Sequence, residues 1–196
     1  MFFRLSLLSF WRVVDPVYYF LTRLKYIETE QSGKAVFRVR LTKYKGADVV
    51  LSDGTCIFHN DVLLKIHLHN VRLLREMQKT ENQVKKAKVI IRKVVESMPL
   101  LADYINTHPE KDRIKGVVGI TLLNKGYSKL GFESHEPKNS LYRTMKHLTQ
   151  IPIYCLSASS FSFERIKKQK PVYLMMSKEK LISTYLTAGK LASNSH

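Results

Sequence analysis

The feature that most constrains the fold is a long run in which apolar residues recur at alternating spacings of four and three. This spacing places one apolar stripe along a helix, and basic residues occupy the opposite face. Pro99 is suited to the first turn of a helix, so we expect a second, shorter helix to begin there and run to about Asn106. The repeating positions are Leu73, Met77, Thr80, Val84, Ala87, Ile91, Val94 and Met98.

The segment before this helix predicts a small antiparallel sheet of three or four strands. Apolar and basic residues alternate over 35–41 and again over 61–69, which is typical of half-buried strands. Between them, Asp53-Gly54 joins two apolar runs in 47–58. This dipeptide favours a hairpin with a type I′ turn, because that turn needs positive φ angles.

The segment after the helix predicts strands that alternate with short helices. That order indicates an α/β fold with a parallel or mixed sheet and helices on its faces. We expect an amphipathic segment at 1–28, one α/β domain at 29–190 and a disordered tail at 191–196. The expected strands are 114–120, 152–156, 172–176 and one beginning at 132; the expected helices run from Thr121 to Gly131, from Asn139, and from Ser177 to about residue 188.

Residues 1–28 are rich in Phe, Trp, Tyr and Leu, with interleaved arginines. Arg12 and Asp15 interrupt the apolar run, so the segment matches neither a signal peptide nor a membrane-spanning helix. One interpretation is an amphipathic helix that lies in the headgroup region of a membrane. The other is a terminal helix, broken at Pro16, that packs on the core of the domain, since both uses demand the same amphipathic face.

The charge of the chain points to anionic partners. Lys and Arg number 33 against 16 Asp and Glu, which gives +17, and +10 of this lies in residues 111–196. An anionic membrane surface or a phosphate-bearing ligand would satisfy this charge. Nucleic acid is less favoured, because the aromatic residues gather at the N-terminus and no RNP, helix-turn-helix or KH signature is present. A solvated cationic surface is the plain alternative.

The two cysteines indicate the compartment. Cys56 and Cys155 are far apart, lie among strand-like residues and have no metal-type spacing, so we expect free thiols. Free thiols fit a reducing, cytoplasmic location. Because an anionic membrane surface is an expected partner, we also expect a peripheral position on the inner face of the membrane.

The first candidate site is formed by His67, His69, Asn70 and Arg72. On a strand, His67 and His69 point the same way, so they resemble half of a metal site, for which His59, Asp61, Glu133 or His135 would be further ligands. No second spacing supports a metal, so we expect none. Binding of a phosphate or carboxylate by this cluster, where the strand leads into the long helix, is the preferred interpretation.

The second candidate site lies around Thr121 and Glu133. A strand that leads through Gly119 and Thr121 into a helix suits an anion, and Glu133 can act as a general base. The alternative is a surface carboxylate paired with Arg143 or a nearby lysine, and Arg143 is also a candidate ligand for an anion. No Walker A, GxGxxG, GxSxG or HExxH signature is present, so the sequence indicates no particular cofactor and leaves enzymatic activity open.

Two stretches carry a resemblance to a known family. The run LTKYKGADVVLSDGTCIFHNDVLLKIHLHNVRLL at 41–74, followed by GVVGITLLNKGYSKLGFE at 116–133, resembles the YkoP-like family of sporulating Gram-positive bacteria, which also occurs as a domain attached to polysaccharide deacetylases. The resemblance covers roughly residues 10–186. It implies a setting in envelope polysaccharide or lipid metabolism, with glycan-processing enzymes as partners, and it supplies no catalytic residue.

Three hypotheses follow for the function. The first is a binding or accessory module at the cytoplasmic face of the membrane, serving envelope polysaccharide or lipid metabolism. The second is an enzyme that acts on a phosphorylated sugar or lipid through His67 and Glu133. The third is a nucleic-acid binder attracted by charge.

Overall fold

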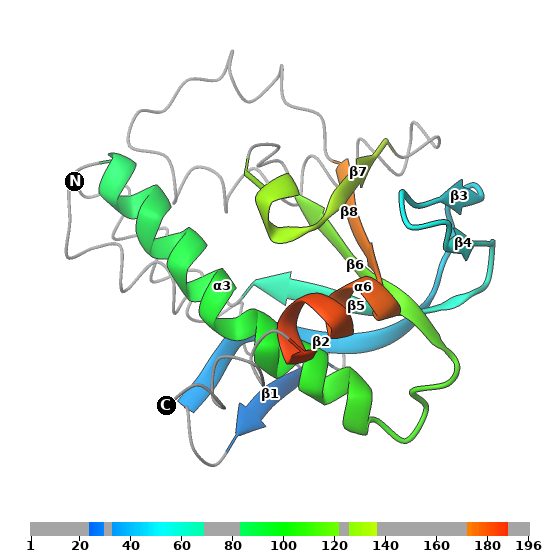
Figure 1. The fold of residues 1–196 in the computed structure, drawn as a ribbon, viewed down its shortest axis with the longest axis horizontal. Helices are drawn as coiled ribbons and strands as arrows, with labels where there is room; N and C mark the ends of the chain where they lie inside the picture. Colours follow the sequence, from blue (N-terminus) through cyan, green and yellow to red (C-terminus); the bar gives the residue numbers. More distant parts are fainter. Residues whose placement is uncertain (1–23, 30–32, 69–82, 122–125, 137–171, 188–196) are drawn as a thin grey trace.

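A mixed six-stranded sheet forms the centre of the protein (Figure 1). The computed structural model describes residues 24–29, 33–68, 83–121, 126–136 and 172–187. The strand order is β1-β2-β5-β6-β8-β7, with β5 and β6 parallel and the other neighbours antiparallel. The predicted α/β fold with a mixed sheet is therefore confirmed. The strands are β1 (Lys25–Thr29), β2 (Gly33–Lys43), β5 (Val62–Leu68), β6 (Ile114–Thr121), β7 (Glu133–His135) and β8 (Val172–Ser177).

Helix α3 (Gln83–Thr107) covers one face of this sheet, and α6 (Lys178–Ile182), continued by a π-helical turn over Ser183–Thr187, packs beside it (Figure 1). The core between them is apolar, because alternate residues of each strand point toward the helices. We call this side the helix face of the sheet. Its buried side chains include Val39, Leu64, Met98, Leu101, Ile105, Val117, Met176 and Leu181.

The expected break at Pro99 does not occur. α3 continues through Pro99 to Thr107 as one helix, so the prediction of two helices is wrong. Proline removes one helical hydrogen bond, the one that Val95 would otherwise accept. Val95 and Pro99 are both exposed, on the solvent side of α3, where water can replace the lost hydrogen bond. Buried residues before and after Pro99 hold the helix on the sheet.

The opposite face of the sheet carries a small β-hairpin, made of β3 (Val49–Val50) and β4 (Cys56–Ile57). We call this side the hairpin face. Leu51 and Ile57 of the hairpin pack on Leu63, Val118 and Met175 in a second, smaller core. The hairpin is separate from the main sheet, so the expected small sheet is divided: its other strands correspond to β2 and β5, which belong to the six-stranded sheet. β1 was not among the expected strands.

The turn of the hairpin also differs from the expected type I′. Gly54 has a φ of +84°, while Ser52 and Asp53 are not among the described residues with positive φ. The N–H of Gly54 donates to the carbonyl of Leu51, and the N–H of Leu51 donates to the carbonyl of Thr55. This pattern is a three-residue loop with a left-handed glycine. Ser52 and Asp53 thereby keep ordinary backbone angles at the tip of the hairpin.

Two of the expected helix boundaries are confirmed and one is wrong. Gly131 ends a short 3-10 helix, η1 (Ser128–Leu130), in the left-handed conformation, and Ser177 caps α6 by accepting from the N–H of Lys180. Thr121 does not cap η1, because it is the last residue of β6 and the N-cap position of η1 is occupied by Tyr127.

Several predictions concern segments outside the described residues. They include the N-terminal segment up to residue 23, Cys155, the helix from Asn139, the strand at 152–156 and the tail. Cys56 is a half-buried free thiol. Among the helices that the structure describes, none is long and apolar enough to cross a membrane.

Candidate functional site

Basic side chains meet on the hairpin face of β2 and β5. Arg38 lies directly opposite His67, and Arg40 lies directly opposite Lys65. Val39, between Arg38 and Arg40, belongs to the core of the helix face, and Ile66, between Lys65 and His67, packs against that core. The alternation of a strand therefore turns all four basic residues to the other side. We call Arg38, Arg40, Lys65 and His67 the basic cluster.

The basic cluster is largely shielded from solvent. Arg38 is 4% exposed and Lys65 is 9% exposed, while Arg40 and His67 are half-buried. Cations of this kind are seldom buried. Arg38 donates a hydrogen bond of 2.6 Å from Nη2 to the hydroxyl of Tyr26, and its guanidinium lies 4.9 Å from the centre of the Tyr26 ring. Tyr26 thus orients Arg38 through both its hydroxyl and its ring.

The same row of the sheet continues across the remaining strands. Lys65 pairs with Val118 in parallel register, so His67 lies level with Ile120, which pairs with Tyr173, which pairs with His135. The Nε2 atom of His135 is buried and makes no hydrogen bond within the described residues. A row of basic groups with aromatic rings at Tyr26 and Tyr173 is chemically suited to an anion that carries an organic moiety.

Glu133 stands in a different environment on the same face, where the tip of the hairpin docks. Its carboxylate accepts hydrogen bonds from the backbone N–H of Ser52 at 3.0 Å, from the hydroxyl of Ser52 at 2.6 Å and from Nζ of Lys180 at 3.3 Å. The alternative in which Glu133 pairs with a nearby lysine is therefore confirmed, and the lysine is Lys180. Through this carboxylate the hairpin tip contacts both β7 and α6.

A second carboxylate completes this attachment. Asp53, next to Ser52, accepts a short hydrogen bond from the hydroxyl of Ser177 and another, at 3.0 Å, from the N–H of Thr55. The Ser177 hydroxyl in turn accepts from the N–H of Lys180 at 3.0 Å. We call Ser52, Asp53, Glu133, Ser177 and Lys180 the docking cluster.

The electrostatics of the docking cluster favour ionised carboxylates. Burial alone would raise the pKa of Glu133, but hydrogen bonds from Ser52 and the charge of Lys180 outweigh burial and lower that pKa below its usual range. Burial would likewise raise the pKa of Asp53, and its bonds to Ser177 and Thr55 and the charge of Lys180 lower it. A lowered pKa suits a hydrogen-bond acceptor that holds the hairpin better than a general base working near neutral pH.

His67 and Glu133 of the two sequence-predicted sites lie on the same face of the sheet, but two strands separate them. β6 and β8 lie between β5, which carries His67, and β7, which carries Glu133; at about 4.8 Å per strand this is roughly 14 Å. His69, Asn70, Arg72 and Arg143 lie outside the described residues. Thr121, at the end of β6, points to the other face from Ile120 by strand alternation.

The residues considered as further metal ligands are dispersed. The backbone N–H of His59 donates to Asp48, and the carboxylate of Asp61 accepts from the N–H of Phe58, both around the hairpin. Glu133 is engaged with Ser52 and Lys180. Within the described ranges, no three His, Cys, Asp or Glu side chains come close enough to hold a metal ion.

Sequence reasoning missed the partners of His67 in the basic cluster. The alternation of 35–41 places Arg38 and Arg40 on one side of a strand, and that of 61–69 places Lys65 and His67 on one side of another. Each set by itself resembles a solvated strand face. The antiparallel register that puts the two sets against each other depends on strands far apart in the chain.

The comparisons with known proteins agree with one another. The family model described as the YkoP domain matches residues 4–185. The chain is 53% identical over 178 residues to the Uncharacterized protein YkoP of Bacillus subtilis (strain 168), a match that covers 91% of this chain and 95% of that protein. No solved structure matches the chain.

Proposed function

The chain belongs to the YkoP-domain family, and we propose that its basic cluster makes it a binding module for a phosphate-bearing ligand. The setting that we propose is envelope polysaccharide or lipid metabolism at the inner face of the membrane, as the family resemblance implies. The observation that carries the proposal is the pairing of Arg38 with His67 and of Arg40 with Lys65 on one face of the sheet.

The geometry of the pairs favours an anion between them. Arg38 and His67, and Arg40 and Lys65, bring basic donors from two neighbouring strands together on one face. An anion that contacts both pairs would accept charge-assisted hydrogen bonds from them, which are about twice as strong as neutral ones.

The donor types favour phosphate among anions. The guanidinium of Arg40 presents a planar fork that matches two phosphate oxygens, while Lys65 offers a compact point charge beside it. His67 contributes an imidazole N–H that can donate to a phosphate oxygen. The Tyr26 ring beside Arg38 would pack against the organic part of the ligand.

A binding experiment with soluble phosphates tests this proposal. Full-length protein is titrated with inorganic pyrophosphate, N-acetylglucosamine 1-phosphate and glycerol 1-phosphate, the last two standing for a sugar phosphate and a lipid headgroup. Arg40→Gln should weaken binding about tenfold or more, because a charge-assisted pair is lost. Arg40→Lys should lie between Arg40→Gln and the unaltered protein, since the charge remains but the fork does not.

The matched control is Arg92→Gln, which removes the same charge from the solvent side of α3, where Arg92 is 66% exposed. It should change these affinities less than twofold. Equal affinity of the unaltered protein and Arg40→Gln for every phosphate would refute the proposal, provided that the thermal midpoint shows both to be folded. The sugar and glycerol arms tell which of the two sources of phosphate is preferred.

A further inference from the structure

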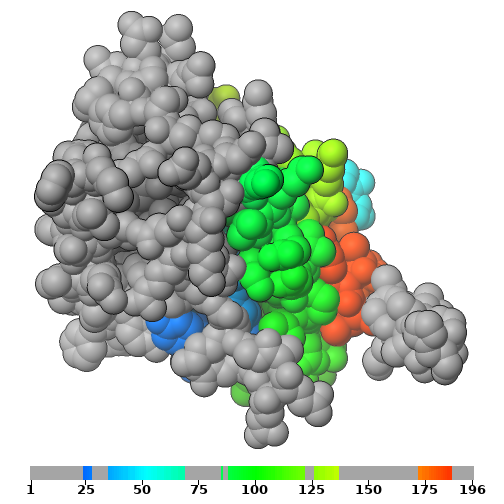
Figure 2. All heavy atoms as spheres, turned by 90° about the vertical axis from the view of Figure 1, so that its left-hand side faces the viewer, coloured from blue at the N-terminus to red at the C-terminus, as the bar shows by residue number. Residues whose placement is uncertain are grey.

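The solvent side of α3 combines basic and apolar residues in one stripe, made of Lys85, Lys88, Ile91, Arg92 and Val95. Ile91 is 49% exposed and Val95 is 44% exposed. They are two of the four large apolar side chains that stand exposed among the described residues, the others being Val50 and Phe58 on the hairpin. Figure 2 shows α3 (green) reaching the surface along much of its length.

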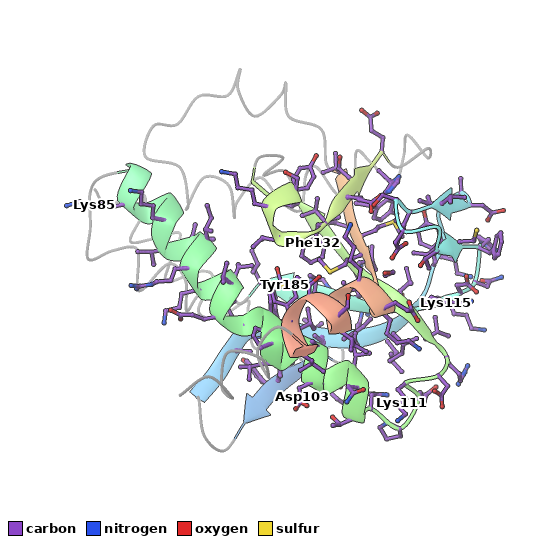
Figure 3. All side chains as sticks on the ribbon, viewed as in Figure 1. Lys85, Asp103, Lys111, Lys115, Phe132 and Tyr185 are labelled. Atoms are coloured by element: carbon purple, nitrogen blue, oxygen red, sulfur yellow. The ribbon has the colours of Figure 1, made fainter. Side chains whose placement is uncertain are left out.

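The charged residues of the stripe itself are all basic. Lys85, Lys88 and Arg92 are exposed, and Figure 3 shows Lys85 projecting from the first turns of α3. Within Gln83–Thr107, the acidic residues begin at Glu96, which pairs with Arg92 and Lys93. At 1.5 Å per residue, the stretch from Lys85 to Val95 extends for about 15 Å.

We infer that this stripe is the surface by which the chain docks on an anionic membrane. Ile91 and Val95 are one helical turn apart, with Lys88 and Arg92 on the same side. This is the pattern of a helix that lies in the interface, with aliphatic groups among the acyl chains and cations at the headgroups. A nucleic-acid backbone would satisfy the cations but would offer no apolar surface to two branched aliphatic side chains.

The inference deepens the membrane setting of the proposed function and is independent of the ligand at the basic cluster. α3 covers the helix face, and the basic cluster lies on the hairpin face. Docking through α3 therefore leaves the hairpin face turned away from the bilayer. The two ideas can fail separately, because their residues lie on opposite sides of the sheet.

Flotation of the full-length protein with vesicles tests the inference. Vesicles of phosphatidylcholine with about a third of phosphatidylglycerol are compared with vesicles of phosphatidylcholine alone, at about 0.1 M salt. Binding should need the anionic lipid. Each basic residue near such a surface contributes about fivefold to the partition coefficient, so Lys85→Gln/Lys88→Gln should lower it by about tenfold to thirtyfold.

The apolar half of the stripe has its own variant. Ile91→Gln/Val95→Gln keeps the charge and the helix propensity and should lower the partition coefficient severalfold, because the aliphatic groups no longer enter the interface. The matched controls are Lys111→Gln/Lys115→Gln, at the far end of the molecule (Figure 3), and Val50→Gln/Phe58→Gln on the hairpin. Both controls should stay within twofold of the unaltered protein.

Three results would overturn the inference: equal binding to both kinds of vesicle, equal losses in the stripe variants and their controls, or unchanged binding in both stripe variants. The stripe variants should leave the titration with soluble phosphates unchanged. Failure of the membrane surface is thus distinguished from failure of the ligand site.

Discussion

Replacement of Glu133 by Gln is expected to loosen the hairpin from the sheet. The carboxylate accepts two hydrogen bonds from Ser52 and one from Lys180, at 3.0, 2.6 and 3.3 Å. A glutamine keeps one oxygen acceptor, but its amide nitrogen is a donor and faces other donors. The variant therefore loses the ion pair and at least one hydrogen bond to Ser52.

The size of this loss follows from the contacts. A hydrogen bond to a charged group contributes about 1.5–3 kcal/mol, and the lower end of this range applies here because both bonds from Ser52 are exposed. The side chains of Glu133 and Lys180 are 24% and 30% exposed, so water screens the ion pair, which adds about 0.2–1 kcal/mol. We expect the docking of the hairpin to weaken by about 1.5–2 kcal/mol, or roughly ten- to thirtyfold in the docking equilibrium.

Hydrogen exchange at the Ser52 amide measures this equilibrium directly, because that N–H donates to Glu133. Its protection should fall by about tenfold or more in Glu133→Gln. The control is Glu179→Gln, one residue before Lys180, where the carboxylate is 66% exposed and lies 3.8 Å from Lys178; it should change protection less than twofold. Unchanged exchange at Ser52 in Glu133→Gln would refute the assignment of Glu133 as the attachment point.

The same contact predicts a dependence on pH. Burial would raise the pKa of Glu133, but Ser52 and Lys180 lower it below the ordinary value of 4.5. Stabilisation by a carboxylate with a lowered pKa is complete above its unfolded value and is lost as the pH falls through its folded value. Protection of Ser52 should therefore be complete above the ordinary value of 4.5 and should fall as the pH drops through the lowered pKa of Glu133, and it should fall less steeply in Glu133→Gln. Parallel profiles would contradict this account.

The remaining predictions concern the packing of the sheet and are tested by urea unfolding. Ser97→Ala should lower the free energy of unfolding by about 1–3 kcal/mol, because the buried hydroxyl accepts from the N–H of Val36 at 3.1 Å and that N–H would lose its partner; a loss below 0.5 kcal/mol would contradict this. Gly116→Ala should cost about 2–3 kcal/mol or prevent folding, since a Cβ there would lie 2.4 Å from the carbonyl oxygen of Met176. Gly119→Ala, where the nearest atom is a side-chain carbon at 3.3 Å, should cost less than half as much, and equal costs would show that the close approach is not the cause.

The sequence by itself determined the local structure where it depends on neighbours along the chain. The alternation at 35–41 and 61–69 corresponds to β2 and β5, Gly131 ends η1 and Ser177 caps α6. Each follows from a period of two or from the chemistry of a helix end. Local rules failed at Pro99, because packing on both sides of the proline outweighs its preference for a first turn.

Only the tertiary structure decided which of these side chains meet. Arg38 and His67 are neighbours through the register of β2 and β5, and Ser52 reaches Glu133 across 81 residues of sequence. A strand pattern states which face a side chain occupies but not which strand lies beside it, because pairing is set by burial summed over the whole sheet. For this reason His67 could be selected from the sequence, whereas its partners in the basic cluster and the role of Glu133 in holding the hairpin could not.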